Sequence, residues 1–195
     1  MKLTASFALT ILSLAGGALP LTTYSQTHTI LGDVEPLGSF LYAFDITAGY
    51  TFTPSHSIQV TAVRSFSGDK VSIWSDAGVR LLEQPVSGPG WAWTTVPLAT
   101  PITLSPNTTY YLSDHFTGWV GVNYAYAWPA TFDHGTVGQD LYFSGYDAFP
   151  IGLYSPYSSN GGPLVDLSYV VVPEPSILAI LVCGLVGLRL RLGRA

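Results

Sequence analysis

Hydrophobic and polar residues alternate along short stretches of this chain, with Gly, Pro and Asn between the stretches. In residues 57–66 (SIQVTAVRSF), for example, Ile58 and Val60 fall on one side of an extended backbone and Gln59 falls on the other. Stretches of this kind, rich in β-branched and aromatic residues, predict strands at residues 39–46, 49–54, 57–66, 70–75, 79–84, 91–98, 101–106, 108–116, 121–128 and 167–172. Between residues 26 and 171 no apolar pattern keeps a helical period over three turns. The pattern therefore predicts an all-β fold, a single β-sandwich.

The C-terminal segment follows a different pattern. Pro173 and Pro175 keep the backbone extended, and residues 177–188 (ILAILVCGLVGL) then carry no charge. As a helix this run is about 18 Å long, and flanking leucines and snorkelling arginines extend it toward the roughly 30 Å of a bilayer core. We expect a transmembrane helix; a buried core helix is the alternative for a run this short. Three arginines, expected on the cytoplasmic side, close the segment: Arg189, Arg191 and Arg194.

The order of these features resembles the PEP-CTERM sorting signal. The motif starts at Val172, Pro173, Glu174 and Pro175, and the apolar run and the arginines follow it. The resemblance implies an exported protein that the tail holds in the inner membrane of a Gram-negative bacterium. It also implies recognition and processing by exosortase, an integral-membrane enzyme, and release to the cell surface or the extracellular space. Bacteria with this sorting system make extracellular polysaccharide, so the resemblance also implies that this polymer is a partner.

The N-terminus has the pattern of a secretory signal peptide. Lys2 supplies a positive charge, residues 7–14 (FALTILSL) form an apolar core, and small residues follow. Cleavage after Ala18 and cleavage after Ser25 both fit. We therefore divide the chain into a signal peptide (residues 1–25), a β-sandwich domain (residues 26–171) and a sorting and anchor segment (residues 172–195).

Charge and cysteine content limit the functions open to the β-sandwich domain, residues 26–171, which we call the body. Residues 26–171 carry three Lys or Arg residues and eleven carboxylates, a net charge of −8. Such a domain binds nucleic acid poorly, because the affinity of proteins for nucleic acid comes from cations that neutralise phosphates. The single cysteine, Cys183, lies in the tail. The body must therefore be stabilised without a disulfide or a cysteine metal site.

Part of the body resembles a second family, the extracellular β-sandwich domain DUF4082. The resemblance runs from Ser57 to Leu112 and rests on QVTAV, GDKVSIWSDAGVRLLEQ and WTTVPLATPITLSPNTTYYLS. It implies a jelly-roll-like fold. It implies no activity, because the family is uncharacterised.

No catalytic motif is apparent in the sequence, and we expect no enzymatic activity. Two Asp–His pairs occur, Asp114–His115 and Asp133–His134, but neighbours on a strand point to opposite faces, so neither pair readily chelates one ion. No cofactor is expected. If the body binds a metal, we expect a structural calcium ion held by loop carboxylates; the alternative is that these acids are simply solvated. The candidate calcium ligands are Asp33, Glu35, Asp69 and Asp166.

Aromatic residues offer a binding surface. Trp91 and Trp93 flank one alanine, so on a strand both face one side, and Tyr124, Tyr126 and Trp128 repeat this spacing. Such a row can stack on sugar rings, or it can fill the core of a sandwich. We therefore expect an exported surface or extracellular-matrix protein associated with exopolysaccharide. The alternative is a carbohydrate-binding module that uses exposed aromatic residues.

Overall fold

The computed structural model describes residues 26–35, 38–42, 45–88, 91–117, 120–124, 130–145, 147–150, 152–153 and 164–173. This part of the chain consists of strands joined by turns and loops and contains no helix. Accordingly, no membrane-spanning helix is found among the described residues.

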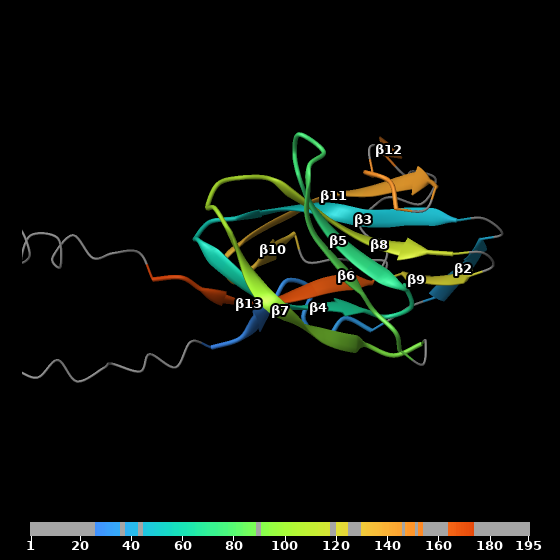
Figure 1. The fold of residues 1–195 in the computed structure, drawn as a ribbon, viewed down its shortest axis with the longest axis horizontal. Helices are drawn as coiled ribbons and strands as arrows, with labels where there is room; N and C mark the ends of the chain where they lie inside the picture. The colour runs from blue at the N-terminus through green and yellow to red at the C-terminus, as the bar shows by residue number, and fades with distance from the viewer. Residues whose placement is uncertain are drawn as a thin grey trace, which may run out of the picture.

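The strands form two antiparallel sheets and a separate strand pair (Figure 1). The first sheet has the order β1 (His28–Thr29), β13 (Val165–Val171), β4 (Ile58–Ser65) and β7 (Thr94–Leu104). The second has the order β10 (Thr131–Phe132), β11 (Gly135–Ser144), β3 (Ile46–Pro54), β8 (Tyr110–Phe116), β5 (Lys70–Ser75) and β6 (Arg80–Pro85), with β12 (Gly152–Leu153) paired to β11. The pair consists of β2 (Gly38–Tyr42) and β9 (Val120–Tyr124). The prediction of an all-β sandwich is therefore confirmed.

The core lies between the two sheets. Val60 and Leu167 from the first sheet share one apolar cluster with Tyr50, Ile73 and Leu112 from the second, and each has 0% exposed surface. Burying a large apolar side chain of this kind contributes about 1.5–3 kcal/mol. The alternation of the sequence produces this arrangement, because every second residue of β4 and β8 points inward.

The outer face of the second sheet is also covered, by residues 145 and 147–150, which we call the covering segment. The hydroxyl of Thr47 donates to the carbonyl oxygen of Gly145 at 2.8 Å and accepts from the amide of Ala148 at 3.3 Å. Phe149 packs on Trp74 and Tyr111, with ring centroids 5.7 and 4.8 Å apart. Strands β3, β5 and β8 are therefore buried on both faces.

The body has two distinct ends. At the terminal end, β1 pairs with β13 and the amide of Val172 donates to the carbonyl oxygen of Ser57 at 2.8 Å. At the distal end, Ser65 pairs with both Val165 and Thr94. Strand β13 spans this length, about 20 Å. Figure 1 shows β1 and the last residues of β13 at one end, and the connection from β6 to β7 at the other.

Some strand boundaries differ from those predicted. Residues 91–98 and 101–106 were expected as two strands, but a single strand, β7, runs from Thr94 to Leu104. Its pairing with β4 contains a register shift between Val60 and Ala62. Strand β11 was not predicted, because its glycines and polar residues hide the alternation. It pairs along β3 with a bulge between Val137 and Asp140.

Candidate functional site

The two candidate tryptophans lie at the distal end, before strand β7 begins. Trp91 has a positive φ of 59° and is 61% exposed. The expectation that Trp91 and Trp93 share one face of a strand is therefore wrong, because strand alternation does not apply before Thr94. Trp91 remains available to a ligand as an exposed aromatic ring.

Trp93 has a structural role instead. The guanidinium of Arg64 lies 4.5 Å from the centroid of its ring, and Phe66 packs edge-on against it. Its indole N–H donates to the carbonyl oxygen of Val34 at 3.4 Å. Of the other aromatic candidates, Tyr124 belongs to β9, whose side chains are outside the description, and Tyr126 and Trp128 are outside the described residues.

A hollow opens at the same distal end. It has a volume of about 260 Å³ and is lined by residues 65–69, 86–88 and Thr94. Asp114 lies beneath the loop of residues 65–69. It is completely buried and accepts a hydrogen bond of 2.5 Å from the hydroxyl of Ser65. Burial raises the pKa of Asp114 well above its usual range. The distal end therefore combines an exposed ring with a small polar recess.

The four acids proposed for calcium do not form one site. Asp69 accepts a hydrogen bond from Thr117 at 2.8 Å, while Asp33 and Glu35 are exposed. Asp166 is completely buried and serves as an anchor for β1. It accepts hydrogen bonds from the amides of Ile30 at 2.9 Å and of Leu167 at 2.7 Å, and its other oxygen is 3.5 Å from Arg64. Burial raises its pKa to about 6.

A Ser–His–Asp arrangement occurs in the second sheet, but it is inaccessible. Nε2 of His115 lies 2.9 Å from Oγ of Ser72, and Nδ1 accepts from the amide of Asp147 at 3.1 Å. Ser72 and His115 have no exposed surface, and burial lowers the pKa of His115 to about 4. A nucleophile needs access to substrate and a base that is effective near neutral pH. This arrangement has neither, so its role is structural.

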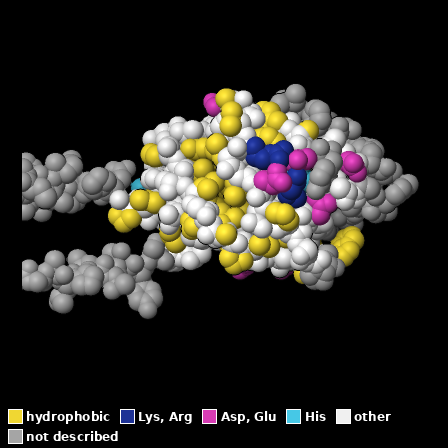
Figure 2. All heavy atoms as spheres, viewed as in Figure 1, with side chains coloured by type: hydrophobic (Ala, Val, Ile, Leu, Met, Phe, Trp, Pro, Cys, Tyr) yellow, Lys and Arg dark blue, Asp and Glu magenta, His cyan; other side chains and the backbone are white. Residues whose placement is uncertain are grey.

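The covering segment is fixed over this polar interior by ion pairs. Asp147 lies 2.8 Å from Nζ of Lys70 and 2.6 Å from the guanidinium of Arg80. Glu83 pairs with the same two cations. Figure 2 shows Lys and Arg side chains gathered with Asp and Glu on one part of the visible face.

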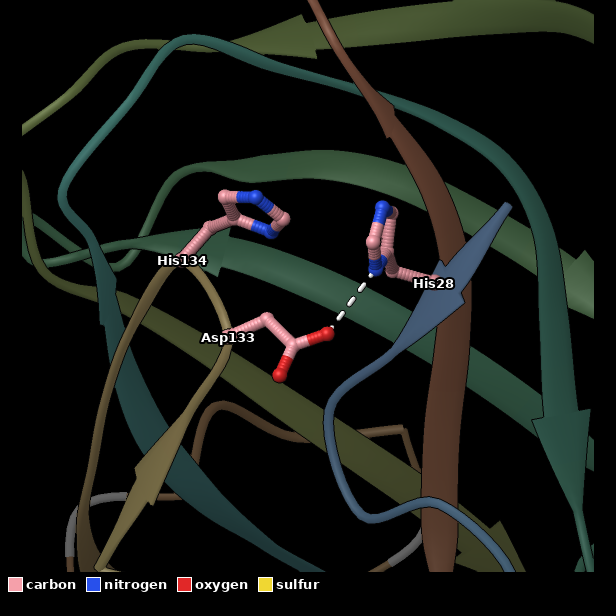
Figure 3. Close-up of side chains that lie close together, drawn as sticks. All are labelled: His28, Asp133 and His134. Carbon is pink, nitrogen blue, oxygen red and sulfur yellow. Dashed lines mark hydrogen bonds and ion pairs between the residues drawn. The ribbon is translucent and has the colours of Figure 1, made fainter. Parts of the chain in front are cut away.

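A second polar cluster lies at the terminal end. His28 comes from β1, and Asp133 and His134 come from the turn between β10 and β11 (Figure 3). Nδ1 of His28 is 3.0 Å from a carboxylate oxygen of Asp133, and the rings of His28 and His134 meet edge to face at 4.6 Å. The strand argument against chelation holds for Asp114–His115, which point to opposite faces of β8. It is wrong for Asp133–His134, because these residues lie in a turn.

The sorting motif lies only partly within the described chain. Val172 and Pro173 directly follow β13 at the terminal end. Glu174, Pro175 and the three tail arginines, Arg189, Arg191 and Arg194, lie outside the described residues, as do residues 1–25.

Comparison with known proteins identifies the body of the chain. The family described as "Domain of unknown function (DUF4082)" matches residues 41–160, which is more than half of the sequence. No curated protein and no solved structure matches the chain significantly. The match covers strands of both sheets as well as the covering segment. The chain therefore belongs to the DUF4082 family of β-sandwich domains.

Proposed function

We propose that this chain is an exported, non-enzymatic surface or extracellular-matrix protein that associates with exopolysaccharide. Its jelly-roll-like body is displayed by a C-terminal PEP-CTERM segment, which anchors the protein in the inner membrane until an exosortase processes it. The apolar run, the arginines and the signal-like N-terminus support this proposal.

The observation that carries the proposal is the position of the two chain ends. Because β1 pairs with β13, both the N-terminal and the C-terminal segments join the body at its terminal end. A body tethered there keeps its distal loops free. This arrangement suits a display domain, whose binding groups are needed away from the membrane.

Sorting is tested by expressing the full-length chain in a host that carries an exosortase. The chain with Pro173, Glu174 and Pro175 all changed to Ala is the test variant, and Glu35→Ala, which changes an exposed loop acid, is the control. We expect the wild type and the control to be exported and shortened, and the triple variant to stay unprocessed in the membrane fraction. Processing of the triple variant, or retention of the wild type in the cytosol, would contradict the proposal.

The exposed ring of Trp91 favours a second candidate function, a carbohydrate-binding module. A ring exposed to 61% at the distal end can stack on a sugar face. The full-length chain in mild detergent is applied to a glycan array, with Trp91→Ala compared against Val79→Ala, which removes another exposed apolar side chain. Saturable binding that only Trp91→Ala loses would establish the module. Binding unaffected by Trp91→Ala would place the glycan on another surface, and no binding at all would contradict a carbohydrate-binding module.

A further inference from the structure

The cluster of His28, Asp133 and His134 brings together two parts of the chain that are far apart in sequence. His28 and Asp133 are separated by 105 residues and belong to different sheets of the sandwich. One ligand atom from each of the three side chains lies within 4.8 Å of the others. Among the described residues no other group of His, Cys, Asp or Glu meets this geometry. Figure 3 shows the carboxylate of Asp133 directed toward the His28 ring, with the ring of His134 beside both.

The distances are close to those that one metal ion requires. With bonds of about 2.0–2.1 Å, the ligand atoms of a tetrahedral zinc ion lie about 3.3 Å apart. The pair formed by His28 and Asp133, at 3.0 Å, is already near this spacing. Small rotations of the side chains would bring His134 to the same distance. Asp133 is free to make such a movement, because its side chain is 73% exposed.

The ligand set selects the type of metal. Two imidazole nitrogens and one carboxylate oxygen suit zinc and other first-row transition metals, whereas calcium prefers six to eight oxygen ligands. This site therefore differs from the calcium site expected from the loop acids. Three protein ligands leave a coordination position for water.

The surroundings provide access and support. A hollow of about 440 Å³, lined by residues 26–32 and 131–133, opens beside His28 and Asp133. The hydroxyl of Tyr169 lies 3.1 Å from Nδ1 of His134, and the ring of His56 packs edge-on against His134 at 5.6 Å. In Figure 2, histidine atoms reach the visible surface at this end of the body. An ion can therefore reach this polar corner from solvent.

We propose that His28, Asp133 and His134 bind one divalent transition-metal ion, such as Zn²⁺, that joins the two sheets at the terminal end. The ion holds β1, a strand of two residues whose pairing to β13 involves only those two, against the turn between β10 and β11. In a body without cysteine, the ion supplies the cross-link that a disulfide would otherwise provide. The proposal does not depend on polysaccharide binding or on sorting.

The test uses the full-length chain, purified in mild detergent and stripped with EDTA. Titration calorimetry with Zn²⁺ should give one equivalent of saturable binding, and Ca²⁺ should give none. At a Zn²⁺ concentration a hundredfold above the dissociation constant, the unfolding midpoint should rise by about 5–10 °C. Asp133→Asn retains the shape of the side chain but loses its charge, and it should weaken Zn²⁺ binding by about tenfold or more.

Two further variants separate an ion site from a simple hydrogen-bonded contact. His134→Gln removes a ligand and should abolish the thermal shift, whereas Asp76→Asn, which changes an exposed acid in the turn between β5 and β6, should bind Zn²⁺ as the wild type does. Circular dichroism confirms that each variant is folded before titration. The proposal is overturned if the wild type binds no Zn²⁺ at one equivalent. It is equally overturned if folded Asp133→Asn and His134→Gln bind Zn²⁺ as tightly as Asp76→Asn does.

Discussion

At the scale of single residues, the burial of His115 makes stability depend on pH. Its Nδ1 accepts a hydrogen bond from the amide of Asp147, so the ring is neutral and carries its proton on Nε2, toward Ser72. Protonating Nδ1 would break the bond to the covering segment and place a charge in a site with no solvent. This explains physically why the pKa of His115 falls to about 4, with burial as the main cause and the nearby Lys70 as the next.

The pH dependence follows from this shift. Between pH 6.5 and about 4 the unfolded chain binds a proton at His115 that the folded chain does not bind, so stability is lost as the pH falls. The loss should amount to about 3 kcal/mol. Asp166, with a pKa raised to about 6, acts in the opposite direction, because its folded form binds the extra proton below that pH. Only a comparison with a variant can therefore isolate the contribution of His115.

His115→Gln is the appropriate variant, since its amide can still donate to Ser72. We expect it to be less stable than the wild type at pH 7 but to lose much less stability on acidification to pH 4.5. Urea unfolding at several pH values gives both slopes. Parallel slopes for the two proteins would show that folding does not lower the pKa of His115.

At the scale of elements, close packing between β3 and β8 leaves no room for a side chain at Gly49. A Cβ there would overlap the carbonyl oxygen of Leu112, which belongs to the backbone of the neighbouring strand. Gly138, on the adjacent strand β11, offers a matched comparison, because the one atom too close to its added Cβ would be the side-chain hydroxyl of Thr51. Backbone atoms of a central strand cannot move away cheaply, whereas a hydroxyl can rotate.

Gly49→Ala should therefore lower the free energy of unfolding by about 2 kcal/mol or more. Gly138→Ala should change it by less than about 1 kcal/mol, since the loss of unfolded-state entropy offsets the small rearrangement. Urea unfolding of both variants measures the difference. Equal effects in the two variants would mean that β3 and β8 are not packed as closely as described.

The elements also show what the sequence could and could not predict. Strands β4, β5 and β8 are runs of β-branched and aromatic residues bounded by turn residues, and the sequence identifies them. Strand β11 breaks its alternation at a bulge, and β1 is too short to show a period. The histidine cluster is invisible in the sequence, because only the packing of the two sheets brings residue 28 beside residue 133. The Asp–His dipeptide at 133–134 is the sequence feature that points to this cluster, but alternation along a strand, which would separate the two side chains, does not apply in a turn.

At the scale of the whole molecule, the two ends of the sandwich carry different features. The terminal end has both chain connections and the histidine cluster, and the distal end has Trp91 and the hollow beside Ser65. About 20 Å of sheet separates them. If the tail anchors the body in a membrane, the terminal end faces the lipid and the distal end is presented outward.

This orientation can be measured on the full-length chain reconstituted in lipid vesicles. Cys183→Ser removes the only cysteine, and a fluorophore is then attached at Ser55→Cys on the terminal end or at Ser87→Cys on the distal end, both exposed positions. A quencher on the lipid headgroups should reduce the emission of the Ser55→Cys label several-fold more than that of the Ser87→Cys label. A soluble quencher should act on both equally, which controls for local exposure. Stronger lipid quenching at position 87 would mean that the body lies with its tryptophan end on the membrane, and Trp91 would then be a membrane contact instead of a glycan platform.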